Sequence, residues 1–276
     1  MRYGDAGEVR EASAELEQLG YSALWLPDVG GDVFGSLRTL LDATVSVVAA
    51  TGILNIWMHT PDETAAGYAE LTAQHGDRLL LGLGVSHAPL VDAQEPGRYK
   101  APLAVMDGYL DGLDAASPAL PREARVLAAL GPKMLELART RSAGAHPYLV
   151  SPEHTRVARE ALGDGGLLAP EQAVVLDTNA ERARAAAREH LAIYLSLPNY
   201  TNNLKRLGFT DDDIGGGGSD RLVDGIVVWG DEATIRARVQ EHRDAGADHV
   251  CIQVLGGGYT DMASDAWRRL APALVG

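Results

Sequence analysis

The stretch that decides the fold, residues 78–89, reads RLLLGLGVSHAP. An apolar run with two glycines separates a charged residue, Arg78, from a polar end that holds Ser86 and His87. A short apolar run bounded in this way is typical of a strand buried on both faces of a parallel sheet. The carboxyl ends of such strands carry the functional groups in α/β proteins. We therefore predict a buried strand over residues 79–85 that delivers Ser86 and His87 to a site.

Short apolar strands and amphipathic helices alternate along the rest of the chain. This succession implies right-handed parallel crossovers, and the fold class that we predict is a (β/α)8 TIM barrel. The competing fold is an open doubly wound sheet, which is disfavoured because no G-x-G-x-x-G motif follows a strand. The predicted strands cover residues 22–26, 51–57, 79–85, 125–130, 145–150, 172–176 and 249–255. The predicted helices cover residues 8–19, 33–50, 62–75, 102–115, 131–140, 153–162, 179–195, 231–245 and 261–274.

A closed barrel of this class needs eight strands, and the chain opens with a helix, so the first strand is the one that is lacking. Two explanations stay open: a true first strand lies upstream, or the short apolar segment 226–229 fills the place. Residues 196–224 interrupt the alternation and contain GGGGS at 215–219. Because a glycine run is flexible, we expect an insertion there that is partly helical and partly mobile. The chain is thus expected to be a single domain over residues 1–276.

Composition limits the classes of function. The 276 residues are 46% hydrophobic and carry a net charge of -14, a globular composition whose acidic balance argues against nucleic-acid and membrane partners. No apolar run approaches the roughly 18 residues of a transmembrane helix, and the first residues lack the apolar core of a signal peptide. The single cysteine, Cys251, cannot form an internal disulfide, which favours a reducing, cytoplasmic compartment. We expect a small molecule as the substrate.

The segment LVSPEHT, residues 149–155, marks the passage from a strand into a helix. Ser151 is placed to cap that helix, and His154 falls in its first turn. Free N–H groups and the helix dipole bind phosphate at such an end. The alternative is an ordinary N-cap followed by proline at the first helical position.

Two further segments carry candidate residues. TGILNIWMH, residues 51–59, places Gly52 and Asn55 within an apolar strand, where a glycine permits a bulge or the close approach of a flat ring; the alternative is an ordinary buried strand.

GVSH, residues 84–87, ends on His87, and histidine is the usual proton donor near neutral pH. The alternative for His87 is a hydrogen bond to backbone in the proline-containing loop that follows. No metal-binding signature is present, so we expect no metal.

Taken together, these segments resemble the bacterial-luciferase-like superfamily, and within it the actinobacterial oxidoreductases that use the deazaflavin coenzyme F420. The resemblance implies a β/α barrel with an insertion, a homodimer, and a cofactor that lies over the carboxyl ends of the strands. It covers nearly the whole chain in family order, through the segments LGYSALWLPD, ATGILNIWMHTP, DRLLLGLGVSHAPLV, LAALGPKMLELA, GAHPYLVSPEHTRVARE, LAPEQAVVLDT and AGADHVCIQVL.

The resemblance also assigns roles to single residues. Relatives carry a bulge, often with a non-prolyl cis peptide, at the position of Gly52 and Ile53, where it backs the central ring of the cofactor. The start of the helix after Val150 matches the phosphate-binding element. The residues that the resemblance assigns to the cofactor are Gly52, Ile53, Asn55, Ser86, Val150, Ser151 and His154.

The chain departs from the family at the end of the strand that reads LPDVGGD, which lacks the histidine that some sugar-phosphate dehydrogenases of the family use. The acid–base residue therefore stays open among Asp28, His59 and His87. The implied activity is hydride transfer between F420 and a small organic substrate. The alternatives are an FMN-dependent monooxygenase and a cofactor-free, truncated paralogue.

Overall fold

The computed structural model describes residues 5–28, 30–257 and 262–275. The chain divides into two compact units: the first comprises Met1–Ala129 and Lys133–His146, and the second comprises Leu130–Pro132 and Pro147–Gly276. Within the described ranges, no helix is both long and apolar enough to cross a membrane. The organisation of residues 1–276 as a single domain with an insertion stays a prediction.

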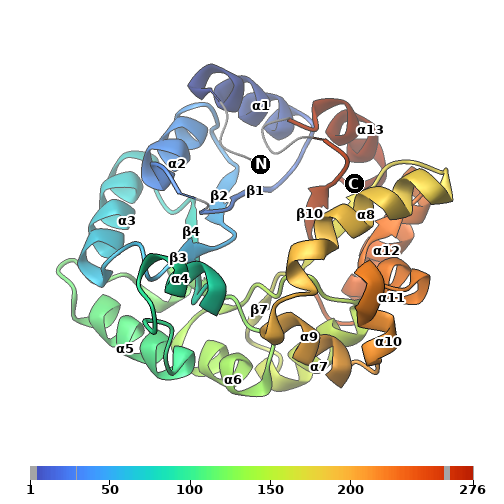
Figure 1. Cartoon of the computed structure of the whole chain (residues 1–276). Coiled ribbons are helices and arrows are strands. Elements are labelled where there is room, and N and C mark those ends of the chain that lie inside the picture. The colour runs from blue at the N-terminus through green and yellow to red at the C-terminus, as the bar shows by residue number, and fades with distance from the viewer. Residues whose placement is uncertain (1–4, 29, 258–261, 276) are drawn as a thin grey trace. The chain divides into compact units, whose positions relative to one another are not determined.

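The first unit is built on a parallel sheet whose strands follow the order β1-β2-β4-β5-β6, with β3 also paired to β4. Helices α1, α2, α3 and α5 lie along one side of these strands (Figure 1). The strands are β1 (Ala23–Leu26), β2 (Val48–Thr51), β3 (Leu54–Asn55), β4 (Leu79–Gly84), β5 (Arg125–Leu127) and β6 (Gly144–Ala145). The helices are α1 (Ala6–Gln18), α2 (Val33–Asp42), α3 (Pro61–His75), α4 (Ala88–Gln94), α5 (Pro102–Ala115), the 3-10 turn η1 (Arg122–Ala124) and α6 (Pro132–Arg141). The first residue of α6, Pro132, is counted with the second unit.

The prediction of a buried strand at residues 79–85 is confirmed by β4, but the prediction of a helix over residues 33–50 is wrong beyond Asp42. Helix α2 ends there, and β2 already begins at Val48. The physical reason is that β-branched Val47 and Val48 suit extended backbone, and the Glu17 carboxylate of α1 accepts N–H groups of the turn before them at 2.7–3.1 Å. The strand predicted over residues 51–57 is correspondingly shifted and continues only as β3.

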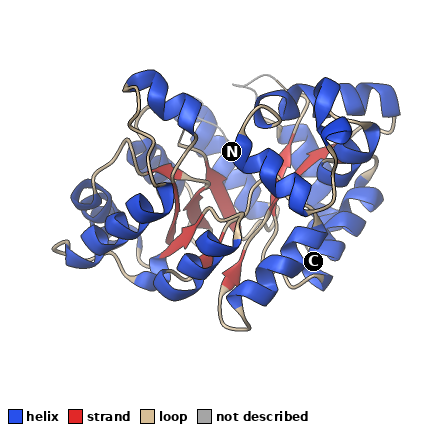
Figure 2. Cartoon of the chain, turned by 60° about the horizontal axis from the view of Figure 1, so that its bottom comes forward, coloured by secondary structure: helices blue, strands red, loops and turns tan. Residues whose placement is uncertain are grey.

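The second unit contains a parallel sheet in the order β10-β8-β9, with helices packed around it (Figures 1 and 2). Part of the segment 226–229 forms the strand β9. This strand pairs with β8 and not with β1, so it does not take the place of the missing first strand. The helix predicted from residue 261 begins at Ser264, and residue 261 lies outside the described residues. The strands of this unit are β7 (Leu167–Leu168), β8 (Glu171–Val175), β9 (Val228–Trp229) and β10 (Cys251–Val254). The helices are α7 (Pro152–Leu162), α8 (Ala180–Tyr194), α9 (Pro198–Arg206), α10 (Asp211–Ile214), η2 (Gly215–Gly217), α11 (Asp220–Ile226), α12 (Glu232–Asp244) and α13 (Ser264–Leu274).

The segment predicted as an insertion, residues 196–224, is helical through α9, α10, η2 and most of α11. Tyr200 and Leu204, four residues apart on α9, bury one helix face in a core shared with Leu149 and with residues of α8 and α11. The expectation of a partly helical segment is therefore confirmed, while its mobility stays a prediction.

Candidate functional site

In the first unit, the backbone bulge after β2 is fitted to its neighbours by glycines. The peptide bond between Gly52 and Ile53 is cis, as the resemblance implies. A Cβ atom on Gly52 would lie 3.0 Å from Nε2 of His146, and a Cβ atom on Gly84 would lie 2.5 Å from the Ile53 side chain. Any larger residue at Gly84 would therefore displace Ile53, and a Cβ atom on Gly82 would lie 2.1 Å from the carbonyl oxygen of Thr51, so both glycines of β4 permit this segment to lie against the strand.

A stacked pair of rings lies beside Gly52. The Trp25 and His146 rings are 4.2 Å apart at an angle of 15°, and both residues are buried. Sequence reasoning assigned no role to this pair, although His146 is a lone imidazole at the end of the short strand β6. The stack supports the bulge from one side, because the same imidazole closes the space next to Gly52.

Asp28, just after β1, makes hydrogen bonds both to the bulge and to a histidine. Its backbone N–H donates to the carbonyl of Ile53 at 3.0 Å, and its Oδ2 accepts the N–H of Asn55 at 3.0 Å. The same Oδ2 lies 3.0 Å from Nε2 of His59. The carboxylate is fully buried and the His59 side chain is 18% exposed. Two of the three predicted acid–base candidates, Asp28 and His59, are therefore brought together.

Ser86 and His87 lie where β4 ends, as expected. Ser86 adopts a left-handed backbone, with φ of 54°, and His87 is the residue before α4. Both side chains are half-buried. An aromatic wall that sequence reasoning missed adjoins them: Trp57 Nε1 donates to the Val85 carbonyl at 2.7 Å, and the hydroxyl of Tyr99 donates to the Ser86 carbonyl at 3.4 Å. The sequence did contain a signal for this wall, because Trp57 lies in the same segment as Asn55.

The second unit holds the segment predicted to bind phosphate, at the start of α7, and the side-chain cap predicted for Ser151 is not formed there. Leu149 has φ of 58°, Pro152 occupies the first turn, and the Ser151 side chain makes no capping hydrogen bond. Val150 and His154 are each 1% exposed, so their side chains do not reach solvent. His154 Nε2 donates to the carbonyl of Leu130 at 2.9 Å, and burial lowers the pKa of this imidazole. The helix start thus offers uncapped N–H groups beside Ser151, which is half-buried.

Glu171 is a second residue that sequence reasoning missed. Its Oε2 accepts the N–H of Leu149 at 3.1 Å, and its own N–H donates to the carbonyl of Pro147 at 2.8 Å. The residue is 2% exposed, and burial raises the pKa of its carboxyl to about 8. The carboxyl is therefore neutral at pH 7 and fixes the turn that leads into α7. The signal for Glu171 in the sequence was an ionisable residue at the first position of an apolar strand.

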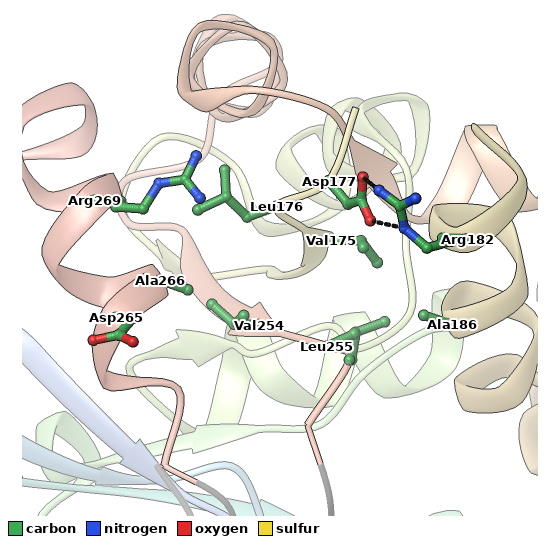
Figure 3. A pocket seen from close by; sticks show the side chains of 11 residues that line it. Val175, Leu176, Asp177, Arg182, Ala186, Val254, Leu255, Asp265, Ala266 and Arg269 are labelled. Carbon is green, nitrogen blue, oxygen red and sulfur yellow. Dashed lines mark hydrogen bonds and ion pairs between the residues drawn. The ribbon is translucent and has the colours of Figure 1, made fainter. Parts of the chain in front are cut away.

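A cavity of about 450 Å³ lies in the second unit at the carboxyl ends of β8 and β10 (Figure 3). Its charged lining residues have ion-pair partners: Arg182 binds Asp177 at 2.8 Å, and Arg269 binds Glu232 at 2.7 Å. None of the predicted site residues lines it. Because its cations are already neutralised, we assign it no ligand.

Comparisons with known proteins identify the family and the fold. The sequence model of the luciferase-like monooxygenase family matches residues 2–249. The chain is 27% identical over 282 residues to 5,10-methylenetetrahydromethanopterin reductase of Methanolobus tindarius, covering 85% of this chain and 86% of the relative.

Solved structures share the fold. The coenzyme F420-dependent tetrahydromethanopterin reductase of Methanopyrus kandleri superposes with a TM-score of 0.76 at 18% identity, covering 100% of this chain and 96% of that one. The oxygenating constituent of 3,6-diketocamphane monooxygenase from Pseudomonas putida, solved with FMN, gives 0.69 at 12% identity and covers 98% and 91%. The predicted luciferase-like, TIM-barrel-like α/β fold class is confirmed. The chain belongs to the luciferase-like monooxygenase family of enzymes.

Proposed function

We propose that this chain is an oxidoreductase that transfers a hydride between coenzyme F420 and a small organic substrate. The observation that carries the proposal is the buried Asp28 carboxylate, which binds both the Asn55 backbone and His59 beside the glycine-fitted bulge of the first unit. The relatives named for F420 or for a methanopterin substrate support the same reading. We propose further that the enzyme acts as a homodimer in the cytoplasm.

Each unit, taken by itself, offers groups that would suit a part of such a cofactor. In the first unit, the side chain of Ile53 lies against Gly84, and Asn55, Ser86 and His59 add polar groups near the same strand ends. In the second unit, the uncapped N–H groups at Ser151 suit a phosphate, since a helix N-terminus carries partial positive charge. When bound, F420 would supply the carbon that accepts or donates the hydride.

The protein's own part is proton transfer and orientation. His59 Nε2 is held by Asp28, which leaves Nδ1 as the atom that exchanges a proton with the substrate. In the oxidising direction His59 accepts the proton as the hydride leaves the substrate, and in the reducing direction it donates one. His87, half-buried at the end of β4, is the second candidate for this role.

The second candidate function is an FMN-dependent monooxygenase, which the family description and the FMN-bound neighbour favour. The two are separated by titrating the purified protein with F420 and with FMN and following the cofactor absorbance and fluorescence. We expect saturable binding of F420. Saturable binding of FMN alone, with oxygen consumption in the presence of a flavin reductase, would establish the monooxygenase instead. Binding of neither cofactor would refute both and point to a cofactor-free paralogue.

A further inference from the structure

The aromatic wall of the first unit, formed by Trp57 and Tyr99 at the end of β4, has no part in the proton transfer proposed above. The two ring centroids are 5.9 Å apart, with 39° between the ring planes, and both side chains are half-buried. Trp57 Nε1 donates to the Val85 carbonyl, and the Tyr99 hydroxyl donates to the Ser86 carbonyl. Because the donors of both rings are turned to the backbone, the ring surface that stays open is apolar.

The turn that carries Trp57 is fixed by Asn55. The Asn55 Oδ1 atom accepts the N–H of Trp57 at 3.1 Å, and the Asn55 carbonyl accepts the N–H of Met58 at 2.9 Å. The N–H of Asn55 in turn donates to the Asp28 carboxylate, which also binds His59. The indole and the imidazole proposed for proton transfer therefore stand two positions apart on one hydrogen-bonded turn.

The segment that carries Tyr99 begins and ends at residues with left-handed backbone. The angle φ is 54° at Ser86 and 45° at Ala101, values that residues other than glycine seldom adopt. Arg98 ties this segment to the turn, because its guanidinium donates to the Trp57 carbonyl at 3.2 Å and lies 5.6 Å from the centre of the indole. Since strained backbone concentrates at functional sites, the placement of Tyr99 points to a role in binding.

Exposed apolar side chains belong to the same two segments. Met58 of the turn is 41% exposed, and Leu90 of α4 is 51% exposed, which makes them two of the five large hydrophobic side chains that are exposed among the described residues. Ile53 of the bulge lies against Gly84, the last residue of β4. The aromatic wall thus stands at the strand end to which the proposed function assigns the cofactor ring, and apolar surface accompanies it.

We propose that the aromatic wall binds the substrate, and that the substrate carries an apolar, planar group beside the carbon that exchanges the hydride. This deepens the proposed function and rests on it. Two rings whose donors are engaged gain by burying apolar surface and give no hydrogen bond to a hydroxyl or a phosphate. The Arg98 guanidinium is engaged as well, by the Trp57 carbonyl and by Glu95 at 3.7 Å. A sugar phosphate on this wall would lose water without gaining partners, so the wall disfavours that class.

The test compares acetophenone with acetone, two methyl ketones that differ only in the phenyl ring, and uses glucose 6-phosphate as the polar, anionic probe. Binding to the protein saturated with F420 is measured by calorimetry. We expect the wild type to bind acetophenone at least about 10-fold more tightly than acetone, with no measurable binding of glucose 6-phosphate at the same concentrations. Trp57→Ala and Tyr99→Ala should each weaken acetophenone binding about 5- to 20-fold and leave acetone within about twofold of the wild type.

Titration of the same variants with F420 separates the substrate from the cofactor. Both alanine variants should bind F420 within about twofold of the wild type, because the rings contact the substrate and not the cofactor. Tyr68→Leu, which removes a half-buried aromatic ring from α3, is the matched control and should leave every affinity within about twofold. Trp57→Leu serves if the alanine variant does not fold, and its preference for acetophenone should lie between those of the wild type and Tyr99→Ala.

Three results would overturn parts of this reasoning. A wild type that binds F420 but binds neither ketone, or binds both equally, would overturn the role of the wall while leaving F420 dependence intact, as would a preference that survives in both alanine variants. A parallel loss of F420 affinity would also overturn it, since the rings would then contact the cofactor. Failure of the wild type to bind F420 would overturn the proposed function, and the same calorimetry on the protein alone would then decide whether the wall selects an apolar ring.

Discussion

Replacing Glu171 by glutamine is expected to remove a pH-dependent loss of stability. In the folded protein the carboxyl is buried and its pKa is raised from 4.5 to about 8, with desolvation as the main cause. An acid whose folded pKa is raised binds its proton more tightly in the folded state than in the unfolded state. Its stabilising contribution is therefore complete below pH 4.5 and is lost as the pH rises through about 8.

The size of the effect follows from the two pKa values. The difference between about 8 and 4.5, at roughly 1.4 kcal/mol per pH unit, corresponds to about 5 kcal/mol between the acidic and alkaline limits. Tyr148 and Cys251, the other titratable side chains that interact with Glu171, also have raised pKa values, the thiol to about 12, so neither titrates in this range.

Glutamine keeps the acceptor for the Leu149 N–H but places an amide where the other carboxyl oxygen, Oε1, has no hydrogen-bond partner among the described residues. That substitution costs about 1–3 kcal/mol at every pH. Glu171→Gln should therefore be no more stable than the wild type at pH 5 and more stable at pH 9, with a crossing between.

The assay is urea unfolding followed by circular dichroism at pH 5 to 9, with Glu160→Gln as the control because it removes an exposed carboxylate from α7. Parallel stability profiles for the wild type and Glu171→Gln would refute the reasoning, since they would mean that the buried carboxyl does not titrate differently on folding.

Three other outcomes are expected. Asp28→Asn should lower kcat by about 10²-fold with little change in F420 affinity, because it weakens the orientation of His59 without touching the cofactor's phosphate; steady-state kinetics and cofactor titration check this, and a parallel fall in affinity would contradict it. Gly84→Ala should destabilise the first unit by about 1–3 kcal/mol in denaturant unfolding, since its Cβ would meet Ile53 at 2.5 Å; a neutral effect would show that the bulge is free to move. Burial lowers the pKa of His242 to about 3, so stability should fall as the pH drops from 6.5 toward 3, and His242→Gln should flatten that slope.

The sequence by itself determined the class of fold and most of its elements. The apolar run at β4 identified a buried strand because its length and boundaries admit little else. The helix predicted over residues 62–75 is found as α3 and begins one residue earlier, at Pro61, where the cap is made locally: the Glu63 N–H donates to the Thr60 hydroxyl at 3.2 Å. Local periodicity failed at Val47 and Val48, where a short apolar run is compatible with both helix and strand until the neighbouring strand is known.

The tertiary structure alone decided which candidates meet. Asp28 and His59 are 31 positions apart, Leu149 and Glu171 are 22 apart, and their hydrogen bonds depend on how strands and turns are placed in space. No spacing rule links such pairs, because the register of the sheet and not the chain fixes their distance.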